Sequence, residues 1–189
     1  MKKLILVTSP PACGKTFVTK QLAKAMTNCV YLDKDSLIVL SKQIFKVAGE
    51  EINRSSDFFE EWIRNYEYDA IMEVAYEALE YNDTVFINAP FTREIKNKEY
   101  MDNLRSELAK RSTKLVVVWV HTDIEVCHQR MIARASDRDD WKLAHWDEYV
   151  ATRDYNKPKG IKDLVVFENS SDIEFKNSLH QITYYLRKL

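Results

Sequence analysis

The sequence has 189 residues, of which 46% are hydrophobic, and a formal net charge of −1. A chain of this size can bury one sizeable core, so we expect a single domain over residues 1–189. The balance of acids and bases disfavours a nucleic-acid surface, and no apolar run reaches the ~20 residues of a membrane span. The three cysteines form no paired spacing, and we interpret them as reduced thiols of a cytoplasmic protein.

Five short apolar segments along the chain are predicted to be β-strands. Their apolar residues are continuous, which is typical of strands covered on both faces of a parallel sheet. The segments are Leu4–Thr8, Cys29–Asp33, Thr84–Asn88, Leu115–Val120 and Leu164–Phe167. Segments with helical spacing separate them, so the sequence predicts an α/β fold of three layers with a five-stranded parallel sheet in the middle.

The first predicted strand is followed by a candidate phosphate-binding loop. It reads Ser9-Pro10-Pro11-Ala12-Cys13-Gly14-Lys15-Thr16 and leads into the first predicted helix, as the pattern G-x-x-x-x-G-K-[ST] requires. Backbone N–H groups at such a helix start face an anion, Lys15 reaches the terminal phosphates, and the Thr16 hydroxyl binds Mg²⁺. Ser9 replaces the first glycine of the pattern, which predicts a differently shaped loop or weaker binding.

Cys13 lies next to Gly14, at the positive end of the predicted helix. A thiol in such a position is expected to have a lowered pKa and a raised reactivity towards alkylating reagents. The alternative is that Cys13 is simply a small residue that the loop tolerates.

Two aspartates, Asp33 and Asp35, follow the second predicted strand. Residues two apart in an extended segment point the same way, so both carboxylates can face the crevice at the carboxyl end of the sheet. One carboxylate of this kind can accept the proton of an attacking hydroxyl, and the other can order the water ligands of Mg²⁺. The alternative for Asp35 is a capping role for a helix that begins at Ser36.

The segment 36–82 contains about twice the helix that one crossover between strands needs. From Asp57 onwards, a long apolar stripe is predicted, made of Phe59, Trp62, Ile63, Tyr66, Val74, Ala78 and Leu79. We interpret the excess as a helical substrate cap. The next predicted strand ends in Asn88, where an acid is common, and this makes an aspartate at position 33 or 35 more necessary.

Three arginines, Arg130, Arg134 and Arg138, recur every four residues and are predicted to lie along one face of a helix. Neither Arg130 nor Arg138 has an acidic residue three or four positions away, whereas Arg134 has Asp137. Like charges stacked in this way predict a clamp for phosphate groups. The alternative is that acids distant in the sequence pair with them.

Together, Gly14-Lys15-Thr16, Asp33 with Asp35, and the arginine run resemble the small P-loop kinases, a group that includes polynucleotide kinase, zeta toxin, gluconate kinase and chloramphenicol phosphotransferase. The resemblance covers most of the chain. It implies the P-loop NTPase fold with strand order 2-3-1-4-5, a lid over about 130–145, and binding of ATP with Mg²⁺.

The resemblance also implies roles for individual residues. Asp35 matches the general base, Lys15 and the three arginines stabilise the transferred phosphoryl group, and Thr16 and Asp33 serve the metal. Nucleotide contacts are implied for Ala12, Cys13, Gly14, Lys15, Thr16 and Phe17, and for Asn169 in the loop that borders the adenine.

Three functions follow as hypotheses. The first is a kinase that phosphorylates a hydroxyl of a small molecule such as a nucleoside or sugar. The second transfers the same group to the 5′-hydroxyl of a nucleic acid, which the near-neutral charge disfavours. The third is a regulatory module that binds ATP without catalysis, and Ser9 and Asn88 keep it open. The acceptor, the preferred purine and the oligomeric state do not follow from the sequence.

Overall fold

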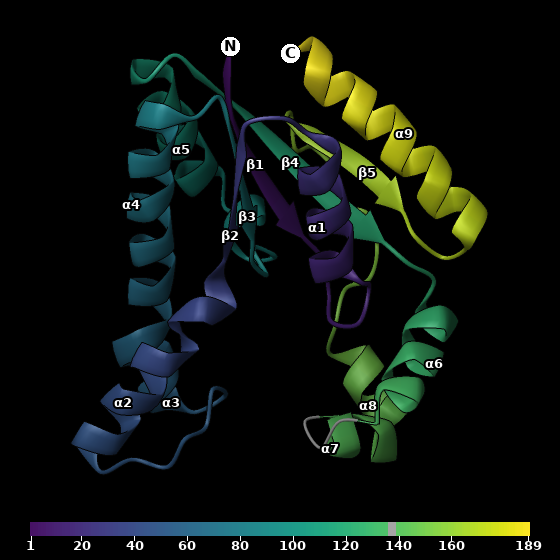
Figure 1. Cartoon of the computed structure of the whole chain (residues 1–189). Helices are drawn as coiled ribbons and strands as arrows, with labels where there is room; N and C mark the ends of the chain where they lie inside the picture. The colour runs from purple at the N-terminus through teal and green to yellow at the C-terminus, as the bar shows by residue number, and fades with distance from the viewer. Residues whose placement is uncertain (136–138) are drawn as a thin grey trace.

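The computed structural model describes residues 1–135 and 139–189. Five parallel strands form one sheet in the order β2-β3-β1-β4-β5 (Figure 1). The strands are β1 (Lys2–Thr8), β2 (Cys29–Asp33), β3 (Thr84–Asn88), β4 (Thr113–His121) and β5 (Leu164–Glu168). The expected α/β fold with a five-stranded parallel sheet, and its strand order, are therefore confirmed.

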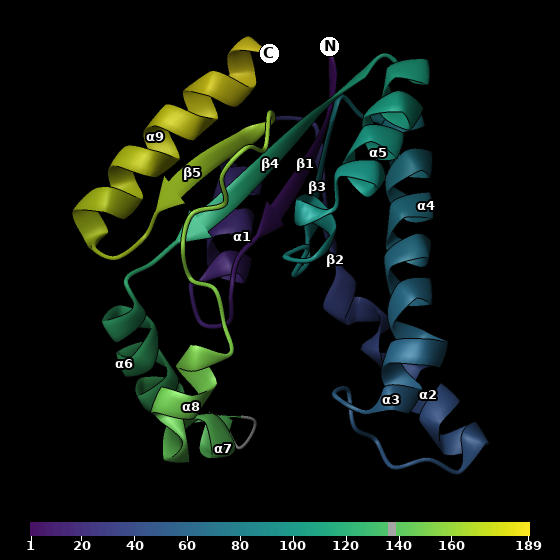
Figure 2. The ribbon, with the colours of Figure 1, turned by 180° about the vertical axis from the view of Figure 1, so that it is seen from behind.

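Helices cover both faces of the sheet and complete the three layers, as the view from behind also shows (Figure 2). One face carries α4 (Asn65–Tyr81) and α5 (Lys98–Lys110), and the other carries α1 (Lys15–Ala25) and α9 (Asp172–Lys188). The side chains of β1 alternate between the two cores, because Leu4 and Leu6 pack on the first face and Ile5 and Val7 on the second. This double burial explains why the strand is apolar throughout.

Two groups of short helices extend beyond the carboxyl end of the strands, on opposite sides (Figure 1). The first group contains α2 (Ile38–Ala48) and α3 (Asp57–Phe59), and the second contains α6 (Ile124–Arg134), α7 (Asp140–Ala144) and α8 (Trp146–Ala151). Both chain termini lie at the other end of the sheet. In the described part of the chain, no helix has both the length and the apolar character that a bilayer crossing requires.

The segment between β2 and β3 divides into a crossover helix and an additional helical part. The crossover helix α4 packs on the sheet, whereas Phe45, Phe59 and Ile63 form a small apolar cluster of their own. A short 3₁₀ helix, η1 (Lys34–Leu37), connects β2 to α2. The helix beyond the needs of one crossover therefore lies in α2, α3 and the turn that follows α3.

The turn after α3 is a π-helical turn, Glu60–Arg64, which continues directly into α4. A π turn holds more residues than an α turn, so it rotates the residues after it about the helix axis. The predicted apolar stripe is wrong at Trp62, Tyr66 and Val74, which are 56%, 63% and 48% exposed. The sequence pattern assumed one continuous α-helical period, and the π turn interrupts it.

Candidate active site

A cavity of about 890 Å³ lies at the carboxyl end of the strands. Segments from five parts of the chain line it: the loop between β1 and α1, the 3₁₀ helix after β2, the loop after β3, the end of β4, and α6 with the segments that follow it. The predicted site residues in this lining are Ala12, Gly14, Lys15, Thr16, Phe17, Asp35, Arg130 and Arg134. Cys13, Asp33 and Asn169 lie outside the lining, and Arg138 lies outside the described residues.

The loop between β1 and α1 has the backbone conformation that its sequence suggests. Gly14 is the residue before α1 and has a φ of 83°, a left-handed conformation that glycine adopts without strain. A Cβ atom at this position would lie 2.7 Å from the Asn169 side-chain nitrogen, so the site also requires glycine for space. The unpaired N–H groups of the first turn of α1 begin at this point and provide a site for phosphate groups.

Ser9 is accommodated in the loop without strain. Its backbone is not among the left-handed conformations of the described chain, so the position does not require glycine. Its hydroxyl is buried and donates a hydrogen bond of 2.8 Å to the Pro10 carbonyl oxygen. The side chain therefore fixes the start of the loop.

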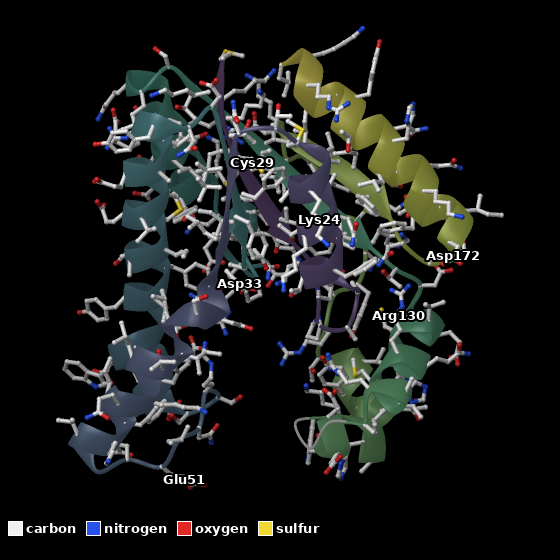
Figure 3. All side chains as sticks on the ribbon, in the orientation of Figure 1. Lys24, Cys29, Asp33, Glu51, Arg130 and Asp172 are labelled. Carbon is white, nitrogen blue, oxygen red and sulfur yellow. The ribbon has the colours of Figure 1, made fainter. Side chains whose placement is uncertain are left out.

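Four polar side chains from α1, β2 and β3 meet beside the loop. Asn88 accepts a hydrogen bond of 2.8 Å from Lys15 Nζ, and its amide nitrogen lies 3.1 Å from Thr16 Oγ1 and 2.9 Å from Asp33 Oδ2. Asn88 thus holds the lysine, the hydroxyl and the carboxylate within one network. Asp33 lies at the end of β2. Arg130 lies at the same end of the sheet but on the opposite side of the molecule (Figure 3).

The ionisation of this network follows from its hydrogen bonds. Burial alone would raise the pKa of Asp33, but hydrogen bonds from Tyr31, Asn88 and the Asp35 backbone outweigh it and lower the pKa. Burial lowers the pKa of Lys15, although the carboxylates of Asp33 and Asp35 act in the opposite direction. Asp33 is therefore a carboxylate at neutral pH.

The carboxylate of Asp33 and the hydroxyl of Thr16 fit a magnesium ion. Mg²⁺ prefers oxygen ligands and is usually held by one or two carboxylates together with water and substrate phosphates. Asn88 brings an oxygen atom of each residue to its amide nitrogen, so the two candidate ligands lie next to each other. Within residues 1–135 and 139–189, no group of three or more histidine, cysteine or acidic side chains forms a metal cage.

Asp35 lies in the 3₁₀ helix and not in an extended segment. The expectation that Asp33 and Asp35 point the same way because they are two apart in a strand is therefore wrong, since β2 ends at Asp33. Asp33 caps the 3₁₀ helix by accepting the Asp35 backbone N–H at 3.1 Å. Asp35 is exposed and lines the cavity. Its side chain is consequently available to a bound molecule.

Arg130 is the α6 arginine that approaches the phosphate loop. Its Nη2 atom donates a hydrogen bond of 2.8 Å to the Asn169 carbonyl oxygen, and its Nη1 atom would lie 3.6 Å from a Cβ at Gly14. The Nη1 atom is buried and has no hydrogen-bond partner among the described residues. A buried donor of a charged group next to a phosphate loop favours a phosphate oxygen as its partner.

Arg134 has a different environment, because it forms an ion pair with Asp139. Its Nε and Nη2 atoms lie 2.6 and 2.5 Å from Asp139 Oδ2, and Lys142 lies 2.8 Å from the other oxygen. Asp139 is fully buried. Asp139 follows Arg134 by five positions, outside the spacing of three or four residues at which helical side chains pair. Arg134 still lines the cavity, so the predicted contact with a phosphate group stays a prediction beside this ion pair.

We predict that the two arginines separate in a mutational test. Arg130→Ala should change stability by no more than about 0.5–1 kcal/mol, whereas turnover per folded molecule should fall by about 100-fold or more. Arg134→Ala should lower the free energy of unfolding by about 1–3 kcal/mol, because the buried Asp139 loses one of its partners. Thermal unfolding and turnover should be measured on both. Equal thermal losses in the two variants would contradict this division.

Asn169 supports the loop with its side chain. The residue is 5% exposed and its amide donates a hydrogen bond of 2.7 Å to the Cys13 carbonyl oxygen. Thr122 donates to the same oxygen at 2.9 Å. Because its side chain is engaged in this bond, a contact with adenine could come only from the Asn169 backbone or its loop. That contact stays a prediction.

The thiol of Cys13 is directed into the core. It is 1% exposed, and its sulfur lies 3.6 Å from the sulfur of Cys127, which is also buried. The hydrogen bond with Cys127 and burial raise the pKa of Cys13. The expected lowered pKa is wrong, because the side chain points away from the helix start that would stabilise a thiolate.

A buried ionic network that the sequence did not predict holds the segment that carries Asp35. Glu67 on α4 is almost fully buried and pairs with Lys34 and with Arg54, the latter at 2.6 and 2.8 Å. The Ser41 hydroxyl donates to the same carboxylate at 2.5 Å. These bonds connect the 3₁₀ helix, α2 and α4. A lone glutamate on the apolar face of a predicted helix was the available signal.

We predict that Glu67→Gln destabilises the fold by about 3–5 kcal/mol, because Lys34 would remain buried without its partner. Burial alone would raise the pKa of Glu67, but hydrogen bonds from Arg54, Lys34 and Ser41 lower it to about 2. The stabilisation is complete above the ordinary pKa of 4.5 and is lost as the pH falls towards 2. Denaturant unfolding between pH 7 and pH 2 measures this. For the substitution, Glu73→Gln on α4 is the control, because Glu73 is exposed. Equal losses of unfolding free energy in Glu67→Gln and Glu73→Gln would refute the predicted role of Glu67.

Comparison with known proteins places this arrangement in a family. Residues 4–155 match a family of AAA domains. The chain belongs to this family. The matched region of this AAA-domain protein includes the phosphate loop, Asp35 and Arg130. No curated protein sequence matches the chain significantly.

Solved structures share the fold of this AAA-domain protein over nearly its whole length. A kinase candidate from Chloroflexus aurantiacus is 22% identical, with a TM-score of 0.59 over 99% of this chain and 94% of its own. A gluconokinase from Sinorhizobium meliloti is 16% identical, with a TM-score of 0.54 over 98% and 95%. Kti12 from Chaetomium thermophilum, solved with ADP-AlF3, is 17% identical, with a TM-score of 0.55 over 95% and 96%. The resemblance to the small P-loop kinases is thereby confirmed at the level of the fold.

Proposed function

We propose that this AAA-domain protein transfers the γ-phosphoryl group of Mg-ATP to a hydroxyl group of a small molecule. One observation carries the proposal. A single cavity is lined by Lys15 and Thr16 of the loop region, by Asp35 and by Arg130, which come from three separate parts of the chain. A phosphate-binding loop, a free carboxylate and an arginine around one cavity are the groups that phosphoryl transfer needs.

Each residue has a role in this proposal. Lys15 and Arg130 neutralise the charge that develops on the transferred group, with Arg134 as a further contact. Asp35 accepts the proton of the acceptor hydroxyl, which suits an exposed carboxylate that lines the cavity. Thr16 and Asp33 would hold Mg²⁺, which when bound to the phosphates offsets their charge.

The helical segments on either side of the cavity have roles as well. We assign the cap to the part of the region 36–82 that precedes α4, and the lid to the region 130–145, of which residues 136–138 lie outside the described structure. Phe17, whose side chain is 56% exposed beside the loop, and the loop at Asn169 would border the nucleoside. A cytoplasmic location stays a prediction from cysteine usage.

A two-step screen tests the proposal. Thermal unfolding is first measured with Mg-ATP and Mg-GTP, because a ligand at 100 times its Kd stabilises the fold by about 2.7 kcal/mol. Acceptor-dependent ADP formation is then measured across a panel of nucleosides, sugars and sugar acids. Stabilisation without any acceptor-dependent ADP would favour an ATP-binding regulatory module. A salt-sensitive gel shift with single-stranded oligonucleotides would favour a nucleic-acid acceptor.

A further inference from the structure

The lining of the cavity carries an excess of positive charge. Among the described lining residues there are seven lysines and arginines but two carboxylates, Asp35 and Asp154. Lys15 and Arg130 face the nucleotide phosphates in the proposed function. Arg93, Lys96 and Arg153 come from other segments, namely the loop and short helix after β3 and the chain after α8. The roles assigned to the triphosphate in the proposed function leave the positive charges of these three residues without a partner group in the ligand.

Two of the three cations have partners at the protein surface. Arg93 forms hydrogen bonds of 2.7 and 3.1 Å with Glu60, and Lys96 forms one of 2.7 Å with Asp154. The side chains of these pairs are between 41% and 65% exposed. Exposed ion pairs of this kind contribute little to stability, so an anionic ligand can exchange with the carboxylate at small cost.

Arg153 has no carboxylate partner in the described part of the chain. Its guanidinium group lies 5.6 Å from the centre of the Tyr149 ring, which orients the cation without neutralising it. The residue is exposed and lines the cavity. A guanidinium group can bind a carboxylate or a phosphate group through two parallel hydrogen bonds, so this residue suits an anion.

Trp119 provides a second, independent indication that the cavity binds a ligand with an acceptor oxygen. It lies near the end of β4, lines the cavity and is 1% exposed. Its indole Nε1 atom is buried and has no hydrogen-bond partner among the described residues. The indole N–H is a donor only. The cations and this N–H group are all donors and line one cavity, so a ligand that contacts them supplies acceptor oxygens.

We propose that the acceptor is a small anionic alcohol, which places its hydroxyl group at Asp35 and a carboxylate or phosphate group at Arg153, Lys96 and Arg93. This inference rests on the proposed function and specifies its substrate class. A nucleic acid would also supply phosphate oxygens, but the net charge of −1 favours a small molecule. Neutral nucleosides and sugars are therefore poor acceptors.

The experiment measures anion binding while the nucleotide site is filled. The protein is first titrated with Mg-AMPPNP by calorimetry and then, at saturation, with inorganic phosphate and separately with malonate. We expect at least one of the two anions to bind with a millimolar Kd. The anion that binds more tightly indicates whether the acceptor carries a phosphate or a carboxylate group. Arg153→Gln and Lys96→Gln should each weaken that binding by at least about 10-fold, which corresponds to about 1.4 kcal/mol.

Lys98→Gln is the matched control for Lys96→Gln, because Lys98 is 93% exposed and does not line the cavity. It should bind the anions as the original protein does. Failure of both anions to bind, or equal binding by Arg153→Gln, would overturn the anionic acceptor while leaving the nucleotide titration intact. Tight, salt-sensitive binding of a single-stranded oligonucleotide that is lost in Arg153→Gln would overturn it in favour of a nucleic acid. Absence of Mg-AMPPNP binding would instead count against the proposed function.

Discussion

Asp35→Asn should abolish phosphoryl transfer while Mg-ATP binds almost as before. The substitution is nearly isosteric, and Asp35 accepts no hydrogen bond from the described residues that hold the loop, so the loop should keep its shape. An asparagine cannot take a proton from the acceptor, and general base catalysis contributes about 10²–10⁴-fold in rate. Steady-state turnover and calorimetric ATP affinity should be measured on the same preparation.

Asp33→Asn is the control for this experiment. Asp33 accepts hydrogen bonds from Tyr31, Asn88 and the Asp35 backbone, so its loss should weaken nucleotide binding and raise the Mg²⁺ concentration required. Transfer by Asp35→Asn at the original rate would disprove the general base role and make Asp33 the candidate. A change in stability alone, of about 1 kcal/mol, would indicate that Asp35 serves the local helix.

Lys15→Ala should weaken ATP binding by about 30- to 1000-fold, which corresponds to about 2–4 kcal/mol for a contact between a cation and phosphate groups. In the described structure, the ammonium group of Lys15 forms a hydrogen bond with Asn88. Alanine removes this one bond among the described residues. The fold should therefore persist, with a thermal midpoint close to that of the original protein.

Lys24→Ala provides the matched control, because Lys24 is an exposed lysine on the same helix, one that does not line the cavity (Figure 3). Calorimetric titration with Mg-ATP compares the two variants. Equal affinity in Lys15→Ala and Lys24→Ala would remove the basis for assigning the loop as a phosphate site.

The strands and the phosphate loop could be predicted because each depends on local sequence. A buried parallel strand needs continuous apolar residues, and all five predicted strand segments begin within two residues of the observed start and end within one of the observed end. Two strands, β1 and β4, begin two residues earlier than predicted, at Lys2 and Thr113. Gly14 was identified from its motif, and its φ of 83° gives the physical reason.

The parts that could not be predicted depend on contacts between distant residues or on a change of helix type. Asp139 reaches Arg134 from beyond the end of α6, outside the spacing that a regular helix provides. The 3₁₀ helix reorients Asp35 after the strand ends. The orientation of Cys13 towards Cys127 depends on how α6 packs against the loop, which the chain order does not reveal.

Mass spectrometry of the products tests the proposed transfer of a phosphoryl group most directly. The protein is incubated with Mg-ATP carrying an isotope label in the γ-phosphoryl group, together with a panel of hydroxy acids, sugar phosphates and their uncharged counterparts. We expect labelled phosphate ester and ADP in equal amounts from an anionic acceptor, and no ester with Asp35→Asn. ADP without a labelled ester, or bound ATP that stays intact with every acceptor, would contradict it.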